Sequence, residues 1–323
     1  FKELSEAIEK TSNLAEKSFG NGKIFIEKFI TNARHIEIQV FGFGPNGSVH
    51  LFERDCSMQR RYQKIIEESP APDIDRSIID SMANAAVKLS TDVKYEGAGT
   101  VEFIYDIQDK KYYFLEMNTR IQVEHPVTEL VTNNDLVSMQ IKFAFDRKTK
   151  FLSQKKISIY GHAIECRVYA EDPSRNFLPS PGKIKKIIFP RIPNGIRLDW
   201  GYDENDEVSF YYDPMIGKII SHALTREDSI SNLIKFLEKV SIKGIETNIP
   251  FLLCLLKNQN FLNGKHNTKY IENNLNSLLS MMPSENKNLE KINIDEQRIK
   301  IIDTDKIDIA QKRSVSKVGG IKV

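Results

Sequence analysis

Residues 114–129 alternate polar and apolar side chains so regularly that they predict an extended chain with two unlike faces. The polar positions are Glu116, Asn118, Arg120, Gln122 and Glu124, and the apolar positions are Leu115, Met117, Ile121 and Val123. Alternate side chains of an extended chain point to the same side. The apolar set can therefore anchor the segment to a core, and only Thr119 breaks the pattern. A half-buried strand alternates too, but this dense mix of opposite charges and amides favours a binding surface.

Two β-rich runs, residues 100–107 and 111–118, flank Gln108-Asp109-Lys110 and predict a hairpin. With its turn centred on Asp109, Glu102 lies opposite Glu116. Like charges that face each other destabilise a sheet, so we expect a cation between them. Oxygen ligands suit Mg²⁺ or Mn²⁺, and Asn118 is a plausible third ligand. The alternative is a pair of solvated glutamates on an exposed sheet.

Composition indicates a globular chain of about two domains. The 323 residues are 40% hydrophobic and 28% charged, as in ordinary globular proteins. The net charge is +2, and the basic residues are spread out, so composition demands neither a nucleic-acid nor a membrane partner. Cys56, Cys166 and Cys254 lack CxxC spacing, which argues against a disulfide framework and a structural zinc site. The sequence begins without methionine and inside a predicted helix, so we expect a piece of a longer chain.

Hydrophobic periodicity and turn residues predict the other elements. Helices are expected at 1–18, 74–93, 134–146, 227–240 and 248–257, and strands at 23–30, 35–41 and 48–52. Residues 53–64 are a charged segment, and residues 157–172 and 182–222 are strand-rich. From about 276 the chain turns polar. The sequence therefore predicts an α+β fold that continues into a second α+β region.

Several motifs together resemble the biotin carboxylase component of biotin-dependent carboxylases. They are Glu-Lys-Phe at 27–29, Arg-His-Ile-Glu-Ile-Gln-Val at 34–40, Glu-Arg-Asp-Cys-Ser-Met-Gln-Arg-Arg at 53–61, Gly-Ala-Gly-Thr-Val-Glu-Phe at 97–103, the 114–129 segment, Gly-His-Ala-Ile-Glu-Cys-Arg at 161–167, Phe-Leu-Pro-Ser-Pro-Gly at 177–182 and Tyr-Asp-Pro-Met-Ile at 212–216. The resemblance covers roughly residues 1–275. Ala-Glu-Asp-Pro-Ser-Arg-Asn at 170–176 resembles the α subunits of acyl-CoA carboxylases of the propionyl-, methylcrotonyl- or acetyl-CoA type.

The resemblance implies an ATP-grasp domain at 1–150, the biotin carboxylase C-terminal domain at 151–275, and a polar linker or the start of a further domain at 276–323. It implies ATP, Mg²⁺ or Mn²⁺, bicarbonate, and biotin on a separate carrier domain. Bicarbonate would be activated as carboxyphosphate, and CO₂ would pass to N1 of biotin. A carboxyltransferase subunit and an oligomer are implied as partners. The family's setting is the bacterial cytoplasm or the mitochondrial matrix.

Family roles transfer to matching positions. Glu27, the Lys28 backbone and Ile30 would contact adenine. His35 and Gln59 would lie at the ribose and phosphates, and Tyr62 stands where many members have a histidine beside ATP. Glu102, Glu116 and Asn118 would hold the metals.

The remaining roles concern bicarbonate and biotin. Arg120 would pair with bicarbonate, since a guanidinium fork suits a planar anion. Lys64 would add a charge, and Gln122 and the Val123 N–H would add donors. Glu124 would be the general base, and Arg167 would stabilise the biotin oxygen.

Simpler interpretations remain open for these residues. Glu124 could pair with Arg120 or His125 in a surface ion-pair network. Arg60, Arg61 and Lys64 could form a solvated basic loop, and Arg167 could extend its charge to solvent from an apolar strand. His125, His162 and Cys166 are expected to be structural.

The chain could also be another ATP-grasp ligase, such as a carboxylate–amine ligase, or a non-catalytic remnant. The first would share Glu102, Glu116 and Asn118 but would not need Arg120, Glu124 and Arg167. The remnant would keep a core but need not keep the charged positions.

The family's N-terminal Rossmann-like domain and its Gly-rich phosphate loop have no match in this sequence. Backbone N–H groups of such a loop hold phosphates, so we expect the isolated chain to be inactive or weakly active. We therefore predict that MgATP raises its melting temperature little or not at all. Thermal unfolding with and without MgATP measures this, and a clear ligand-dependent rise would contradict it.

Overall fold

The computed structural model describes residues 2–147, 152–282 and, for the backbone, 315–317. The chain divides into two compact units, Phe1–Thr31 and Asn32–Val323. Helices and strands are mixed along the chain, and the predicted α+β class is confirmed. Most of the segment predicted as a linker or further domain, 276–323, lies outside the described residues.

The first unit consists of helix α1 (Lys2–Phe19) and the segment after it. α1 confirms the predicted helix, which ends where Gly20 adopts a φ of 68°, a conformation that costs glycine little. Residues 23–30, predicted as a strand, are not one, and no described strand pairs with them. That prediction was wrong because the β-rich pattern of the segment finds no partner edge to complete its backbone hydrogen bonds.

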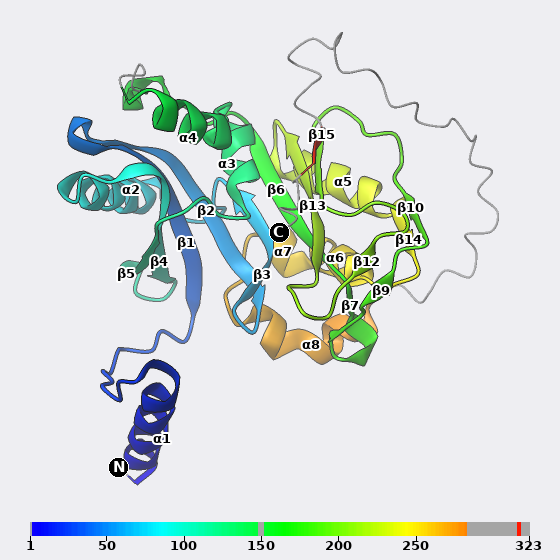
Figure 1. Ribbon diagram of the computed structural model, residues 1–323, viewed down its shortest axis with the longest axis horizontal. Coiled ribbons are helices and arrows are strands. Elements are labelled where there is room, and N and C mark those ends of the chain that lie inside the picture. The colour runs from blue at the N-terminus through cyan, green and yellow to red at the C-terminus, as the bar shows by residue number, and fades with distance from the viewer. Residues whose placement is uncertain (1, 148–151, 283–314, 318–323) are drawn as a thin grey trace. The chain divides into compact units, whose positions relative to one another are not determined.

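The second unit is built around one nine-stranded sheet (Figure 1). In spatial order its strands are β15 (Val315–Lys317), β11 (Ile196–Trp200), β13 (Met215–Ala223), β6 (His162–Tyr169), β3 (Gln63–Ser69), β2 (Ser48–Arg60), β1 (Ala33–Phe43), β4 (Glu96–Asp106) and β5 (Lys111–Asn118). β3 pairs with β6, so the sheet runs without a break from the predicted ATP-grasp region into the predicted C-terminal region.

β1 separates two kinds of environment because its side chains alternate. Ile36, Ile38 and Val40 pack against helix α2 (Arg76–Asp92) in one hydrophobic cluster. Phe41 joins a second cluster with residues of helix α4 (Leu136–Phe145). The polar residues of 35–39 therefore share the face away from α2.

The predicted hairpin forms from β4 and β5, and Glu102 does pair with Glu116. Near the turn, however, Asp106 pairs with Lys111, so the turn centres between residues 108 and 109. The register shifts between Glu102 and Phe103, which leaves Leu115 as an extra residue. This bulge brings Glu116 opposite Glu102, as bulges re-aim side chains, and leaves Leu115 exposed rather than in the core as predicted.

The charged segment 53–64 is mostly strand rather than loop. It forms the end of β2 and the start of β3, joined at a tip where Arg61 and Tyr62 have φ values of 49° and 66°. Arg61 is exposed, but Arg60 is buried and its guanidinium lies 4.0 Å from the centre of the Phe177 ring. A solvated basic loop is therefore wrong for Arg60, because the Phe177 ring covers its guanidinium and Glu171 contacts it at 3.4 Å.

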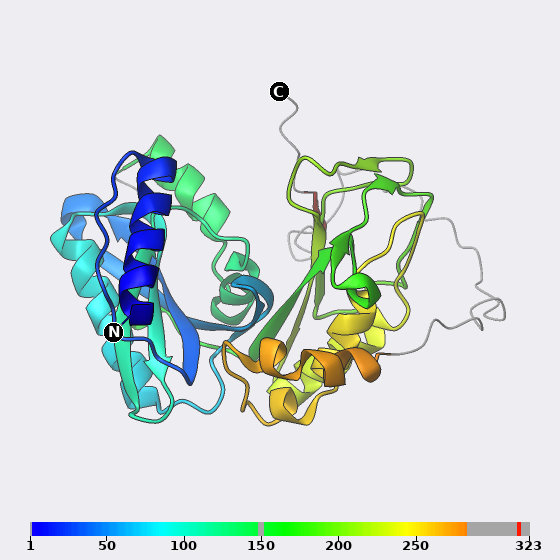
Figure 2. The same ribbon diagram turned by 90° about the horizontal axis from the view of Figure 1, so that it is seen from below.

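The C-terminal region completes the second unit. It holds α5 (Arg226–Leu237), α6 (Ile249–Leu256), α7 (Gln259–Leu262) and α8 (Tyr270–Ser280), and the short strands β7 (Glu171–Asp172), β8 (Leu178–Pro179), β9 (Gly182–Lys183), β10 (Lys186–Ile188), β12 (Glu207–Val208) and β14 (Ser241–Lys243). The yellow and orange helices α5–α8 gather beside one another (Figure 2) and enclose the largest hydrophobic cluster. α3 (His125–Thr132), which the sequence analysis missed, packs against β3, β6 and β13.

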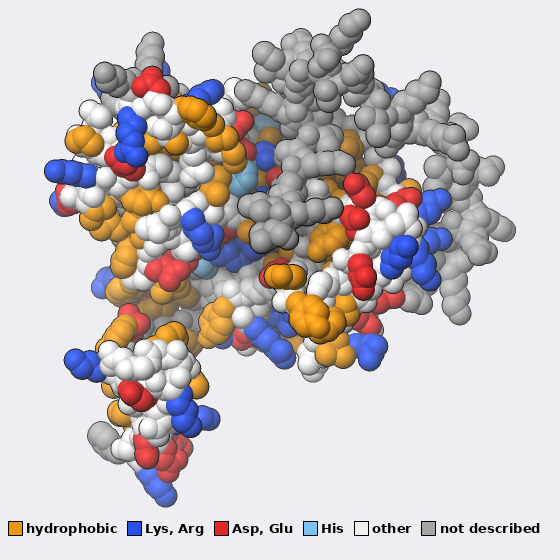
Figure 3. Space-filling model, viewed as in Figure 1, with side chains coloured by type: hydrophobic (Ala, Val, Ile, Leu, Met, Phe, Trp, Pro, Cys, Tyr) orange, Lys and Arg blue, Asp and Glu red, His pale blue; other side chains and the backbone are white. Residues whose placement is uncertain are grey.

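The surface agrees with the composition. Lys and Arg side chains lie scattered among acidic and apolar ones on the face in Figure 3. The three cysteines are free and buried. Among the described helices, none has the length and apolar character needed to cross a bilayer.

Glu68 on β3 connects the predicted ATP-grasp region to the C-terminal region, because its side-chain partners Arg226 and His162 belong to the latter. Its carboxylate accepts hydrogen bonds from Arg226 Nε at 2.6 Å and Nη2 at 2.9 Å, and it contacts His162 Nε2 at 2.7 Å. Burial would raise the pKa of Glu68, but Arg226 and His162 lower it to about 2. The ionised carboxylate is thus the form that the fold stabilises.

We predict that Glu68→Gln lowers the free energy of unfolding by about 3 kcal/mol at pH 7, because it leaves buried cations without their partner. The pKa of Glu68 is depressed in the folded state, so its contribution is present above pH 4.5 and is lost as the pH falls towards 2. Urea unfolding at several pH values measures both effects. A difference between wild type and variant that stays constant from pH 6 to 2 would contradict this assignment.

Candidate active site

A cluster of buried charged side chains lies on the face of the sheet away from α2. Arg54 on β2 is its centre, with no exposed surface. Its guanidinium donates hydrogen bonds to five side chains from β1, β4, α3 and the segment before α3, namely Glu37 at 2.5 Å, Gln39 at 2.6 Å, Thr100 at 3.1 Å, Thr128 at 2.9 Å and Gln122 at 2.9 Å. One cation therefore fixes four chain segments around the cluster.

Lys64 brings three carboxylates of the cluster together. Its Nζ lies 2.8 Å from Glu37, 3.1 Å from Glu102 and 2.5 Å from Glu124. Burial would raise the pKa of Glu37, but Arg54 and Lys64 lower it to about 2. Lys64 is thus part of a buried ionic cluster, and the solvated-loop interpretation is wrong for it as well.

Glu124 is held between two cations. Lys64 contacts its Oε1, and Arg167 Nη2 donates to its Oε2 at 2.9 Å. Burial and the nearby charge of Glu37 would raise the pKa of Glu124, but Lys64 and Arg167 lower it below its ordinary value. A buried carboxylate with this environment is ionised at neutral pH, as a general base must be. The surface-network interpretation is wrong, because only 2% of Glu124 is exposed.

Arg167 ends inside the protein and does not extend its charge to solvent. Besides Glu124, it binds Glu67 of β3, to which its Nε donates at 2.5 Å. His162 and Cys166 on the same strand are buried, and His125 contacts Glu129 at 3.3 Å. These three positions match the structural roles predicted for them.

The residues predicted as metal ligands meet around one amide. Asn118 Nδ2 donates to Glu102 and to Glu116, each at 3.0 Å. Glu102 also contacts His35 Nε2 at 2.9 Å and accepts from Gln122 at 2.8 Å. Burial would raise the pKa of Glu102, but His35 and Lys64 hold it well below its usual range.

The oxygen-rich donor set fits a hard divalent cation. The Asn118 amide would present its oxygen after a flip, an orientation that is inferred rather than observed in most structures. Among the described residues, the donor atoms of His35, Glu37 and Glu102 also lie within 4.8 Å of one another. Glu37 was not predicted as a ligand. A divalent ion bound by either set of residues would offset negative charge on Glu37 and Glu102, whose charge Lys64 balances in this structure.

The remaining predicted residues lie at the edge of the cluster or outside it. Gln59 Nε2 lies 3.5 Å from His35 Nδ1. Arg120 is exposed and donates to Ile121 O at 3.2 Å and to Asn118 Oδ1 at 3.5 Å. The backbone oxygen of Val123 accepts a hydrogen bond from Lys218, and the role of its N–H towards bicarbonate stays a prediction. Tyr62 is exposed at the tip between β2 and β3, with Lys269 Nζ 5.1 Å from its ring centre.

Glu27, Lys28 and Ile30 belong to the first unit and stay predictions.

Three buried residues of the cluster, Glu37, Arg54 and Glu67, were not predicted from the sequence. A signal for the first was present, because His35, Glu37 and Gln39 alternate with apolar residues along 34–40 in the same way as the 114–129 segment. Arg54 and Glu67 gave no such signal, since neither lies in a regular alternation: Arg54 stands between Glu53 and Asp55, and Glu67 follows two isoleucines and precedes Glu68.

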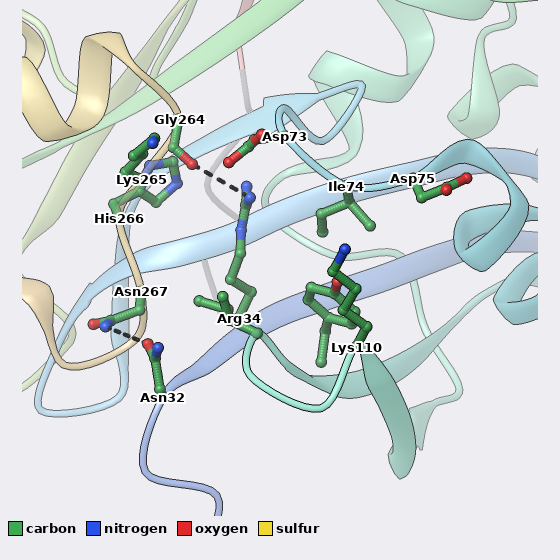
Figure 4. A pocket seen from close by; sticks show the side chains of 12 residues that line it. Asn32, Arg34, Asp73, Ile74, Asp75, Lys110, Gly264, Lys265, His266 and Asn267 are labelled. Carbon is green, nitrogen blue, oxygen red and sulfur yellow. Dashed lines mark hydrogen bonds between the residues drawn. The ribbon is translucent and has the colours of Figure 1, made fainter.

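A cavity of about 730 Å³ lies on the other face of β1 (Figure 4). Arg34 extends into it and donates to the backbone oxygens of Pro72 at 2.6 Å and Gly264 at 3.4 Å. Across the cavity, Asn267 donates to Asn32 at 2.8 Å. None of the residues predicted for the site lines this cavity, so it is separate from the charged cluster.

We predict that Arg54→Lys lowers the free energy of unfolding by about 3 kcal/mol, because an ammonium cannot serve the five acceptors of a fixed guanidinium. The matched control is Arg147→Lys, whose exposed partner is Glu96 and whose expected cost is below about 1 kcal/mol. Urea unfolding measures both. Equal losses in the two variants would show that Arg54 does not organise the cluster.

Two family models match successive parts of the chain. Residues 1–151 match the carbamoyl-phosphate synthase L chain, ATP binding domain, and residues 165–273 match the biotin carboxylase C-terminal domain.

Curated relatives match the same region. The chain is 48% identical over 270 residues to Biotin carboxylase 1 of Bacillus subtilis, with 84% of this chain and 60% of that protein covered. It is 46% identical over 278 residues to the mitochondrial methylcrotonoyl-CoA carboxylase subunit alpha of Rattus norvegicus, with 86% and 39% covered. The chain thus spans at most about 60% of these relatives.

Solved structures share the fold. A biotin carboxylase from Campylobacter jejuni in complex with β,γ-ATP is 42% identical with a TM-score of 0.79, covering 84% of this chain and 60% of that one. The biotin carboxylase domain dimer of Hydrogenobacter thermophilus 2-oxoglutarate carboxylase, with MgADP, ADP and bicarbonate, is 40% identical with a TM-score of 0.80, covering 86% and 60%.

Proposed function

Because this chain is a member of the biotin carboxylase family, we propose that it forms the catalytic part of a biotin carboxylase, an ATP-dependent ligase that carboxylates biotin on a carrier domain. The observation that carries the proposal is Glu124, an ionised carboxylate held between Lys64 and Arg167. Glu124, the proposed base for bicarbonate, is therefore in direct contact with Arg167, the proposed cation for biotin. The proposed limits are 1–150 for the ATP-grasp domain and 151–275 for the C-terminal domain.

The roles proposed for the site are those that the family resemblance implies, and the charges of the cluster support them. Arg120 and Lys64 bind bicarbonate with Gln122 and the Val123 N–H, and Glu124 takes its proton. The bicarbonate oxygen then attacks the γ-phosphorus of ATP, and ADP leaves. Carboxyphosphate releases CO₂ and phosphate, phosphate takes the N1 proton of biotin, and N1 attacks CO₂. Arg167 stabilises the negative charge on the biotin oxygen during this step.

Glu102, Glu116 and Asn118 are proposed to hold Mg²⁺ or Mn²⁺, which neutralises charge on the transferring phosphoryl group. Glu27, Lys28 and Ile30 are proposed to contact adenine, with His35, Gln59 and Tyr62 nearer the ribose and phosphates. The nucleotide, Mg²⁺ and bicarbonate named with the Hydrogenobacter relative support these assignments.

The final acceptor is proposed to be an acyl-CoA, carboxylated by a separate carboxyltransferase subunit. The 170–176 motif and the similarity to methylcrotonoyl-CoA carboxylase support this choice over 2-oxoglutarate. An oligomer is proposed because a relative crystallised as a dimer. The cytoplasm of a bacterium or the mitochondrial matrix is the proposed setting.

We predict that the chain, joined to the N-terminal region of a biotin carboxylase, releases phosphate from ATP in a bicarbonate- and biotin-dependent manner. Glu124→Gln keeps the shape of the side chain but removes the base, so the rate should fall about 100- to 10,000-fold. The matched control is Glu238→Gln, which changes a glutamate of the exposed pair with Lys257.

ATP cleavage that is equally fast without bicarbonate and biotin would refute the proposed function. Cleavage that depends on an amine instead would favour a carboxylate–amine ligase. A wild type that folds and binds nucleotide without any cleavage would favour the non-catalytic remnant.

A further inference from the structure

A second pair of glutamates lies behind Arg167, on the same face of the sheet. Glu67 of β3 pairs directly with Glu165 of β6. Arg167, two residues along β6, pairs directly with Lys218 of β13. Two like-charged pairs thus lie side by side in three adjacent strands, an arrangement that destabilises a sheet when all four groups are charged.

The two glutamates are bonded very differently. Glu67 accepts the hydrogen bond from Arg167 Nε with its Oε1, and its Oε2 has no hydrogen-bond partner among the described residues. Neither oxygen of Glu165 has a hydrogen-bond partner among those residues. Both side chains are fully buried. An ionised carboxylate without hydrogen bonds is very costly to bury, so only one of the two has the contacts that an anion needs.

Lys218 lies near Glu165 but makes its closer contacts to other groups. Lys218 Nζ lies 4.0 Å from Glu165 but 3.5 Å from Asp199 of β11, and it donates its hydrogen bond to Val123 O. The other charged neighbours are Glu67 and Glu124, both negative, and Arg167, which is bonded to those two instead. The cations near Glu165 therefore make their hydrogen bonds and closer contacts to other groups.

We propose that Glu67 is a positioning residue for Arg167, and that Glu165 opposite it is held as an uncharged carboxylic acid so that Glu67 carries the single negative charge of the pair. Glu67 contacts the Nε and Nη2 atoms of the Arg167 guanidinium, and Glu124 contacts Nη2 as well. The remaining N–H groups of Arg167 are thereby aimed at the proposed biotin oxygen. The catalytic consequence rests on the proposed function, but the charge arrangement does not.

Electrostatics support this arrangement. Burial raises the pKa of Glu165 to about 8, and the charges of Glu67 and Glu124 act in the same direction against Lys218 and Arg167. A group with that pKa is mostly protonated at pH 7. Burial also raises the pKa of Glu67 above its ordinary value, but Arg167 opposes this rise with both its charge and a hydrogen bond that Glu165 lacks. A protonated Glu165 also gains a donor, and Glu67 on the neighbouring strand has an acceptor oxygen with no hydrogen-bond partner among the described residues.

The first test is the infrared difference spectrum between wild type and Glu165→Gln at pH 7. We expect the carbonyl stretch of an un-ionised carboxylic acid to disappear in the variant. The matched control is Glu129→Gln. Burial would raise the pKa of Glu129, but His125 and Arg197 lower it to about 2, so this buried glutamate is ionised at pH 7. That difference spectrum should contain carboxylate bands instead. Carboxylate bands for Glu165→Gln would overturn the proposal.

The second test follows the Arg167 Nε–H signal by NMR, assigned by its loss in Arg167→Lys. We expect slow exchange with water in wild type and in Glu165→Gln, and fast exchange in Glu67→Gln. Glu67→Asp, which keeps the charge on a shorter side chain, should restore part of the protection. An Nε–H signal unaffected by Glu67→Gln would overturn the positioning role. Neither spectroscopic test needs catalytic activity.

Kinetics then separate this proposal from the proposed function. In the joined protein, Glu67→Gln should lower kcat/KM for biotin about 10- to 100-fold, the loss expected for a hydrogen bond to a charged group. The matched control, Glu238→Gln in the exposed pair with Lys257, should match wild type. A wild type without biotin-dependent activity would refute the proposed function alone, because the two spectra still decide the charge arrangement.

Discussion

The buried guanidinium of Arg54 is the constraint on which the rest of the site depends. A charge without solvent contact is tolerated only when its hydrogen-bonding groups find partners, and here the partners come from four different segments. Those segments must meet at one point for Arg54 to be buried at all. The position of Gln122 and of the Glu124 that follows is therefore tied to the strands β1, β2 and β4.

The alternation of side chains along β1 lets one strand serve two environments. Ile36 and Ile38 bury their side chains under α2, while Glu37 on the opposite face binds Arg54 and Lys64. The apolar face contributes the hydrophobic free energy that a cluster of buried ions does not supply. The stable core and the polar site are thus two faces of the same strand, and a register slip of one residue would exchange them.

Local patterns in the sequence predicted the strands and helices whose periodicity is regular, and they placed Glu102 opposite Glu116. That pairing depends on a bulge at Leu115, which no local pattern announced. Residues 23–30 have a β-rich composition but no partner strand, and composition cannot reveal a missing partner. The contacts of Arg54 and Glu67 could not be predicted for a related reason, since their partners lie on segments far away in the sequence. The alternation placed Arg120 and Glu124 on a predicted binding surface, but the roles proposed for them and for Arg167 rest on the resemblance to a family.

The state of Glu124 has a consequence for how the site must work. Both of its oxygens are occupied by cations, and a carboxylate stabilised by two cations is a weak base. A bicarbonate ion that draws Lys64 towards itself would weaken one of these contacts and raise the basicity of Glu124 as the substrate arrives. Glu67 would keep Arg167 in place during this exchange, because its bond to the Arg167 Nε does not involve Glu124. The two glutamates would therefore allow the proposed base to be released while Arg167 stays in place for the proposed second substrate.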